Sequence, residues 1–215
     1  MPCAEYIAKN GNFTEAKVWQ SWMEETAKAS NKFMDFNVDR DGVPVDPFSY
    51  NEAASISHLV TGATKAGMVS LAEYVTEKAG KDRRFNDRYG RADFWLSDAN
   101  NRHWEFEFKQ PYVQMSSNSR LEKMMGASRK DALKLLLRGE KIKEREISIV
   151  AGRIFHTLPL YTGRIHEFDT RIRELCAAKK FDQQQHVSWV RHGWKISPRS
   201  GFAPTYLVFD VLSAL

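Results

Sequence analysis

The sequence predicts a single domain of mixed α/β class, and three observations support this class. Residues 103–109 alternate aromatic and charged side chains, and a period of two is typical of a β-strand. Residues 12–31 carry Trp19, Met23 and Ala27 along one stripe, which is the spacing of an amphipathic helix. The chain has 215 residues with 42% hydrophobic and 27% charged content, which suits one ordinary globular core.

The first part of the chain predicts a helix, a connection, a second helix, a strand and a loop, at residues 12–31, 35–49, 51–64, 68–76 and 77–90. Asn12 and Glu15 make a cap-like start for the first helix. We expect Ala53, Ile56 and Val60 to form the buried row of the second helix. These assignments place a helix directly before the first strand.

The rest of the chain predicts a hairpin, a helix, a central strand, another helix and a final strand, at residues 91–109, 119–138, 144–155, 165–179 and 206–212. Ser119 and Glu122 form a capping box at the start of the third helix, and Gly139 follows its end. Between residues 51 and 155 the predicted order is therefore helix, strand, strand, strand, helix, strand.

The hairpin is the most informative segment because of the side chains that it would bring together. Its second strand places Glu107 and Lys109 on one face, and the turn at residues 98–101 is polar and rich in Asn. If the chain reverses at Asn100, Asp93 lies directly opposite Glu107. Such pairs have Cβ atoms about 4.5–5.5 Å apart, close enough for two carboxylates to hold one divalent cation. A register shift of one residue would separate them.

Asp93 followed by Glu107-Phe108-Lys109 and Gln110 resembles the motif of the PD-(D/E)XK nuclease superfamily, in which Ala92 replaces the usual Pro. The predicted order of elements is also the core order of that superfamily. The resemblance implies a restriction-endonuclease-like α/β/α sandwich with a central mixed sheet and an αβββαβ core at residues 51–155. It leaves residues 1–50 as an N-terminal helical part and 156–215 as a C-terminal extension.

The resemblance also implies an activity, hydrolysis of phosphodiester bonds in DNA with Mg²⁺ or Mn²⁺. Asp93, Glu107 and the backbone carbonyl of Phe108 would bind the metal ion, and Lys109 would stabilise the phosphate or orient the attacking water. Many members add a Glu from the preceding helix, for which Glu52 is the candidate and Glu73 the rival. Roles in defence, in repair or recombination, or in a phage life cycle all fit such an enzyme.

Basic side chains near the motif are candidates for phosphate or DNA contacts: Arg91, Gln110 as a polar neighbour, Arg129, Lys130, Arg191 and Lys195. Residues 189–195 mix tryptophans with cations, which suits stacking on unpaired bases, although core tryptophans beside surface charges are the commoner case. The DNA partner is single- or double-stranded, and a homodimer is an open alternative.

Two other interpretations stay open. The segment Glu105 to Lys109 also fits a half-exposed antiparallel strand with its charges in water. The same fold without turnover would be a binding or anti-defence protein. The two cysteines and the absence of a long apolar run or a leader pattern favour a cytoplasmic protein, and a net charge of +5 permits a polyanionic partner.

Overall fold

The structure is a computed structural model that describes residues 4–10, 16–40, 42, 44–79, 87–109, 112–113, 149–159, 170, 185–197 and 201–212. Side chains are described for residues 19–40, 42, 44–48, 50–74, 93–106, 108 and 170. The described part of the chain combines helices with a β-sheet, so the predicted α+β class is confirmed at this level.

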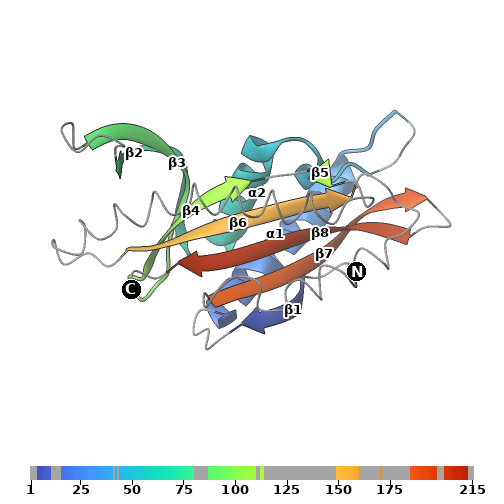
Figure 1. Cartoon of the computed structure of the whole chain (residues 1–215). Helices are drawn as coiled ribbons and strands as arrows, with labels where there is room; N and C mark the ends of the chain where they lie inside the picture. The colour runs from blue at the N-terminus through green and yellow to red at the C-terminus, as the bar shows by residue number, and fades with distance from the viewer. Residues whose placement is uncertain are drawn as a thin grey trace.

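The described strands form one mixed sheet of eight strands in the order β1-β7-β8-β6-β4-β3-β2, with β5 paired to β6 (Figure 1). Their bounds are β1 Ala4–Asn10, β2 Val69–Ala79, β3 Asp87–Ser97, β4 His103–Lys109, β5 Tyr112–Val113, β6 Ile149–Pro159, β7 Gln185–Ser197 and β8 Gly201–Leu212. Strands β2, β3 and β4 are antiparallel, whereas β4 and β6 are parallel. A parallel pair needs a crossover of a dozen or more residues. Residues 110–148 provide it, and the helix predicted at 119–138 lies there, outside the described residues.

Two long helices, α1 (Ala16–Phe36) and α2 (Glu52–Lys65), lie on one side of the sheet, and the short 3-10 helix η1 (Pro47–Ser49) precedes α2 (Figure 1). Asn51 caps α2 because its side chain accepts a hydrogen bond from the backbone N–H of Ala54 at 2.8 Å. At the other end, the N–H groups of Gly67 and Met68 bond to the carbonyls of Thr64 and Ala63. Gly67 has a φ of +79°, so this end is a Schellman motif and confirms the predicted helix end.

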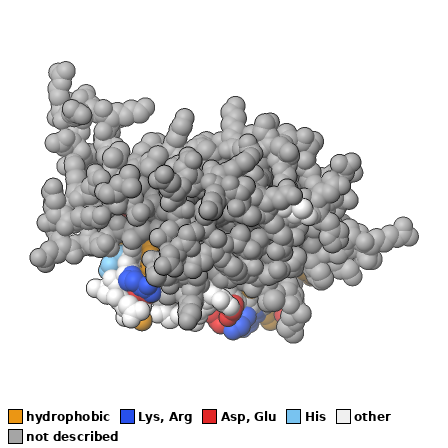
Figure 2. All heavy atoms as spheres, turned by 60° about the horizontal axis from the view of Figure 1, so that its bottom comes forward, with side chains coloured by type: hydrophobic (Ala, Val, Ile, Leu, Met, Phe, Trp, Pro, Cys, Tyr) orange, Lys and Arg blue, Asp and Glu red, His pale blue; other side chains and the backbone are white. Residues whose placement is uncertain are grey.

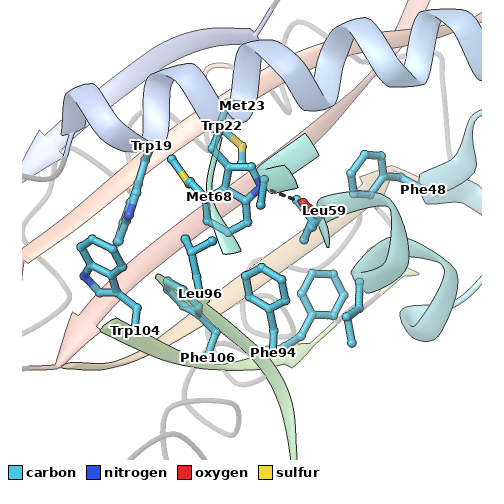
Figure 3. Packing of buried hydrophobic residues seen from close by; sticks show 13 residues of the cluster. Trp19, Trp22, Met23, Phe48, Leu59, Met68, Phe94, Leu96, Trp104 and Phe106 are labelled. Carbon is cyan, nitrogen blue, oxygen red and sulfur yellow. Dashed lines mark hydrogen bonds between the residues drawn. The ribbon is translucent and has the colours of Figure 1, made fainter. Parts of the chain in front are cut away.

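The core lies between these helices and one face of the β3–β4 hairpin (Figure 3). Trp22 stacks on Phe94 with ring centroids 5.3 Å apart, and its Nε1 donates to the carbonyl of Leu59 at 2.8 Å. Trp19 meets Phe106 edge-on at 5.8 Å. The alternating aromatics of β4, Trp104, Phe106 and Phe108, are all buried, as their period of two predicts.

Several predicted elements differ from the structure in their bounds. The loop predicted at 77–90 was too long, since β2 continues to Ala79 and β3 begins at Asp87. These charged residues are strand because Lys78 pairs with Arg88 and Ala79 with Asp87 in the β2–β3 ladder. Helix α1 ends at Phe36, beyond the predicted residue 31, and β8 begins at Gly201, before the predicted residue 206. Strand β6 runs past the predicted residue 155 to Pro159, and residues 144–148 of that prediction lie outside the described residues.

The apolar row predicted for α2 was partly wrong. Ala53 is exposed, and the buried row is instead Ser55, Ile56, Leu59, Gly62 and Ala63. Small residues on that row allow α2 to approach α1 closely, and a count of large apolar side chains overlooks them. Strands β1, β5 and β7 were not predicted, and the helix predicted at 165–179 lies, apart from Thr170, outside the described residues. None of the described helices has the length and apolar character needed to cross a bilayer.

Candidate functional site

The hairpin of β3 and β4 has the register that the sequence predicts. Its pairs run from Phe94–Phe106 to Ser97–His103, so the chain reverses at Asn100. The backbone N–H of Asp98 bonds to the carbonyl of Arg102 at 3.1 Å, which closes a loop of residues 99–101. Asn101 ends this loop with a φ of +59°, the left-handed conformation that such hairpin loops require at that position.

The carboxylate of Asp98 holds the loop together. It accepts hydrogen bonds from the backbone N–H of Asn100 at 2.9 Å and of Arg102 at 3.0 Å, and from Nε of Arg102 at 2.7 Å. Arg102 also places its guanidinium over the ring of Trp104, 5.4 Å from the centroid. Polar contacts therefore hold the turn in one conformation, and the turn sets the register between β3 and β4.

The structure brings Asp93 to the predicted Glu-x-Lys segment. Phe94–Phe106 is the last pair of the β3–β4 ladder, one step before Asp93 would face Glu107. Beyond this pair, the side chain of Asp93 makes the contact between the two strands: its Oδ2 accepts a hydrogen bond from the backbone N–H of Phe108 at 2.8 Å. That N–H belongs to the peptide between Glu107 and Phe108, so the carboxylate lies at the backbone of the predicted metal-binding segment.

The β2–β3 ladder is interrupted at the same place. Ala72 pairs with Phe94 and Tyr74 with Ala92, whereas Glu73 and Asp93 between them are left out of the described pairing. Glu73 has a φ of +50°, an uncommon conformation for a residue other than glycine. Counted by register, Asp93 stands between Glu73 on β2 and Glu107 on β4. Backbone outliers of this kind cluster at functional sites, which makes Glu73 a stronger rival to Glu52 than the sequence indicated.

A buried acid on β4 escaped the sequence analysis. Glu105 is 2% exposed, and its Oε1 accepts a hydrogen bond from the hydroxyl of Tyr74 at 2.6 Å. The interpretation of this strand as half-exposed, with its charges in water, is therefore wrong for Glu105. A buried carboxylate needs donors, and the tyrosine two strands away supplies one. Nothing in the sequence identified Tyr74 as its partner.

The remaining predicted site residues differ in how much of each the structure describes. Glu52 is the first residue of α2 and is partly buried. The structure describes only the backbone positions of Glu107, Lys109, Arg91, Arg191 and Lys195, each of which lies in a strand. Gln110, Arg129 and Lys130 lie outside the described residues. Among the described side chains, no group of three or more His, Cys, Asp and Glu residues could hold a metal ion, and the side chain of Glu107 is not among them.

The donor chemistry of the site nevertheless suits a hard divalent cation. Mg²⁺ and Mn²⁺ prefer carboxylate and carbonyl oxygens, which Asp93, Glu107 and the backbone of Phe108 would provide. A carboxylate has about four lone-pair sites, so the hydrogen bond from Phe108 does not by itself prevent Asp93 from binding a metal ion. Comparisons of the chain with protein-family models, with curated proteins and with solved structures found no match.

Proposed function

We propose that this chain is a metal-dependent nuclease that hydrolyses phosphodiester bonds in DNA, with a restriction-endonuclease-like αβββαβ core. The hydrogen bond from the Phe108 N–H to the Asp93 carboxylate carries this proposal. It joins the aspartate of one strand to the Glu-x-Lys segment of the next, which is the relationship that the resemblance requires. The carboxylate of Asp93 is thereby next to the segment that carries Glu107, where the two acids could share a cation.

The order and direction of the elements support the same proposal. Helix α2 is followed by β2, β3 and β4 as an antiparallel set, and β6 then lies parallel to β4. This agrees with the helix and four strands of the expected core. The fifth element of the pattern, the helix between β4 and β6, would occupy part of residues 110–148, outside the described residues.

In the proposed mechanism, Asp93, Glu107 and the Phe108 carbonyl would hold the metal ion, and the scissile phosphate would bind at the same place. Bound Mg²⁺ would supply Lewis-acid stabilisation of the phosphate and lower the pKa of a bound water. Lys109 neutralises the charge that develops on the phosphate as water attacks in line. Glu52 or Glu73 accepts a proton from the attacking water, the bond between phosphorus and the leaving sugar oxygen breaks, and a proton from solvent completes the new hydroxyl group. The fixed backbone of β4 keeps Glu107 and Lys109 in register with Asp93.

The direct test is cleavage of plasmid DNA and of labelled single strands by purified protein with Mg²⁺ or Mn²⁺. We expect Asp93→Ala and Lys109→Ala each to lower the rate by a factor of about 100 or more, the range for losing one electrostatic or acid–base group. Asp35→Ala, an exposed aspartate on α1, is the matched control and should cut normally. Cleavage that survives both active-site variants, or no cleavage with either metal, would refute the nuclease.

A second measurement separates the enzyme from a binding protein of the same fold. A metal ion that binds only the native state raises the unfolding midpoint, so Mn²⁺ should raise Tm in the wild type and not in Asp93→Ala. DNA binding without cleavage and without a Mn²⁺-dependent shift would assign the chain to the binding class.

A further inference from the structure

An apolar and aromatic surface adjoins the proposed site on the sheet face that points away from α1 and α2. We call it the β2–β4 patch, and it consists of Val69 and Leu71 on β2, Trp95 on β3 and His103 on β4. Val69 is 66% exposed and Leu71 is 52% exposed. Trp95 and His103 are partly exposed and stack on each other, with centroids 5.4 Å apart and ring planes 27° apart.

The strand register shows that these four side chains are neighbours. Leu71 pairs with Trp95, while Val69 pairs with Ser97, which in turn pairs with His103. The residues between them on β3, Phe94 and Leu96, are buried in the core on the other face, so alternation puts the patch on the outer face. The patch therefore crosses three strands, and His103 reaches Trp95 diagonally because the residue directly opposite Trp95 on β4 is the buried Glu105.

The patch leads directly to the proposed catalytic residues. Asp93 stands two residues from Trp95 along β3, a separation of about 7 Å in an extended strand. A group that binds on Trp95 therefore lies next to anything held at Asp93. Exposed apolar side chains next to the proposed site make this surface a candidate for ligand binding.

The chemistry of the patch favours a flat, partly apolar ligand. Tryptophan and histidine rings stack on nucleobases, and such stacking is tolerant of sequence because every base has a π-face. A base inside a duplex is already stacked on both sides, so only an unpaired base can use this surface. Figure 2 shows one face of the molecule, where hydrophobic, basic and acidic side chains and a histidine reach the surface among the described residues.

We infer that the β2–β4 patch stacks an unpaired nucleobase beside the scissile phosphate, and that the substrate is single-stranded or locally unpaired DNA. This inference rests on the proposed nuclease function. In it, the base lies on Trp95, His103 holds the indole ring in place, and Leu71 and Val69 cover the edge of the base. It predicts a preference for single strands that the acidic residues alone do not explain.

Binding of fluorescein-labelled oligonucleotides, measured by anisotropy in EDTA so that no cleavage occurs, tests the inference. We expect Trp95→Ala to weaken binding of a single strand about 5- to 100-fold, and Trp95→Phe to retain most of the affinity. Binding of the matched duplex should change much less. Tyr50→Ala is the control, because Tyr50 is 52% exposed but lies outside the patch.

A second variant covers the case in which Trp95→Ala fails to fold. Leu71→Asp changes an exposed position and places a negative charge in the patch, so it should also weaken binding of the single strand. Unchanged affinity for single strands in Leu71→Asp, or equal losses for single strand and duplex, would overturn the inference. So would a change of oligomeric state in Leu71→Asp with DNA binding intact, since the patch would then bind a second copy. If the patch variants selectively lose binding of single strands but the wild-type protein cleaves no DNA, the patch binds nucleobases and the nuclease proposal is rejected.

Discussion

The carboxylate of Asp93 accepts a hydrogen bond from the backbone N–H of Phe108, 2.8 Å away on the neighbouring strand. Two variants separate the effect of this hydrogen bond on stability from the effect of the negative charge of Asp93 on metal binding. Asp93→Asn keeps an oxygen acceptor, so we expect a Tm close to that of the wild type but loss of the Mn²⁺-dependent rise. Asp93→Ala leaves the Phe108 N–H without this acceptor and should cost a further amount of about 1–3 kcal/mol. Equal stability of the two variants in chemical denaturation would contradict a stabilising role for the hydrogen bond between Asp93 and Phe108.

The Tyr74–Glu105 hydrogen bond should stabilise the sheet measurably. Glu105 is 2% exposed, so removing the donor with Tyr74→Phe leaves a buried charge with one partner fewer, at a cost of about 1–3 kcal/mol. Glu105→Gln should remove most of the penalty in the Tyr74→Phe background, because an amide is easier to bury than a carboxylate. A double-mutant cycle by urea unfolding measures the coupling. A coupling energy of zero would mean that the contact contributes nothing.

Gly62 should tolerate no side chain. A Cβ at this position would lie 1.9 Å from Oγ1 and 2.8 Å from Cα of Thr26 on α1. Alanine normally favours a helix over glycine by about 1 kcal/mol, so a loss of stability would show that packing decides. We expect Gly62→Ala to destabilise by about 1–3 kcal/mol or more.

Thr26→Ala provides the matching control, since it removes the nearest atom, Oγ1. In the Gly62→Ala background it should recover part of the loss, and calorimetry of both variants tests this. A more stable Gly62→Ala protein would mean that the two helices are further apart than the structure has them.

The loop of the hairpin predicts a ranking of substitutions at Asn101, whose φ is +59°. Glycine adopts this conformation without steric cost, whereas a Cβ makes it unfavourable by roughly 1–2 kcal/mol, less for Asn. Asn101→Gly should therefore match or exceed the wild-type Tm, and Asn101→Ala should lower it. The reverse order would exclude a left-handed residue here.

Asp98 predicts a dependence of stability on pH. Burial alone would raise its pKa, but the hydrogen bonds and charge of Arg102 and the N–H of Asn100 outweigh this and hold the pKa of Asp98 below its ordinary value. A lowered folded-state pKa stabilises the protein above the unfolded value of about 3.9, and the contribution disappears as pH falls through the folded value. Asp98→Asn should be less stable than the wild type at pH 6, and the difference should shrink below about pH 4. Parallel Tm curves from pH 3 to 7 would count against this.

The sequence was sufficient for the hairpin because its determinants are local. The alternation of residues 103–109 and the turn at 98–101 together define the register, and Asp93 reaches Phe108 as a consequence. The contact of Tyr74 with Glu105 could not be predicted, because regular alternation would put Tyr74 on the same face as Ala72. Ala72 packs against the core, and Glu73, which has a left-handed φ and lies outside the described pairing, stands between the two residues. No pattern of apolar residues indicates such a conformation.

Strands β1 and β7 were missed for a different reason. Their partners are far away in the sequence: Ala4 pairs with Arg191, and Asn10 with His186. A short strand has no local signal that identifies a partner so far away in the sequence. The roles of the Glu107 and Lys109 side chains remain predictions.

The pairing of β1 with β7 also has a kinetic consequence. During synthesis β1 emerges long before β7, so the backbone groups of β1 wait without these final hydrogen bonds until β7 has been made. Closing so large a loop is entropically slow. The hairpin with its two covering helices can assemble earlier, and the outer edge of the sheet should be the last region to gain protection from hydrogen exchange.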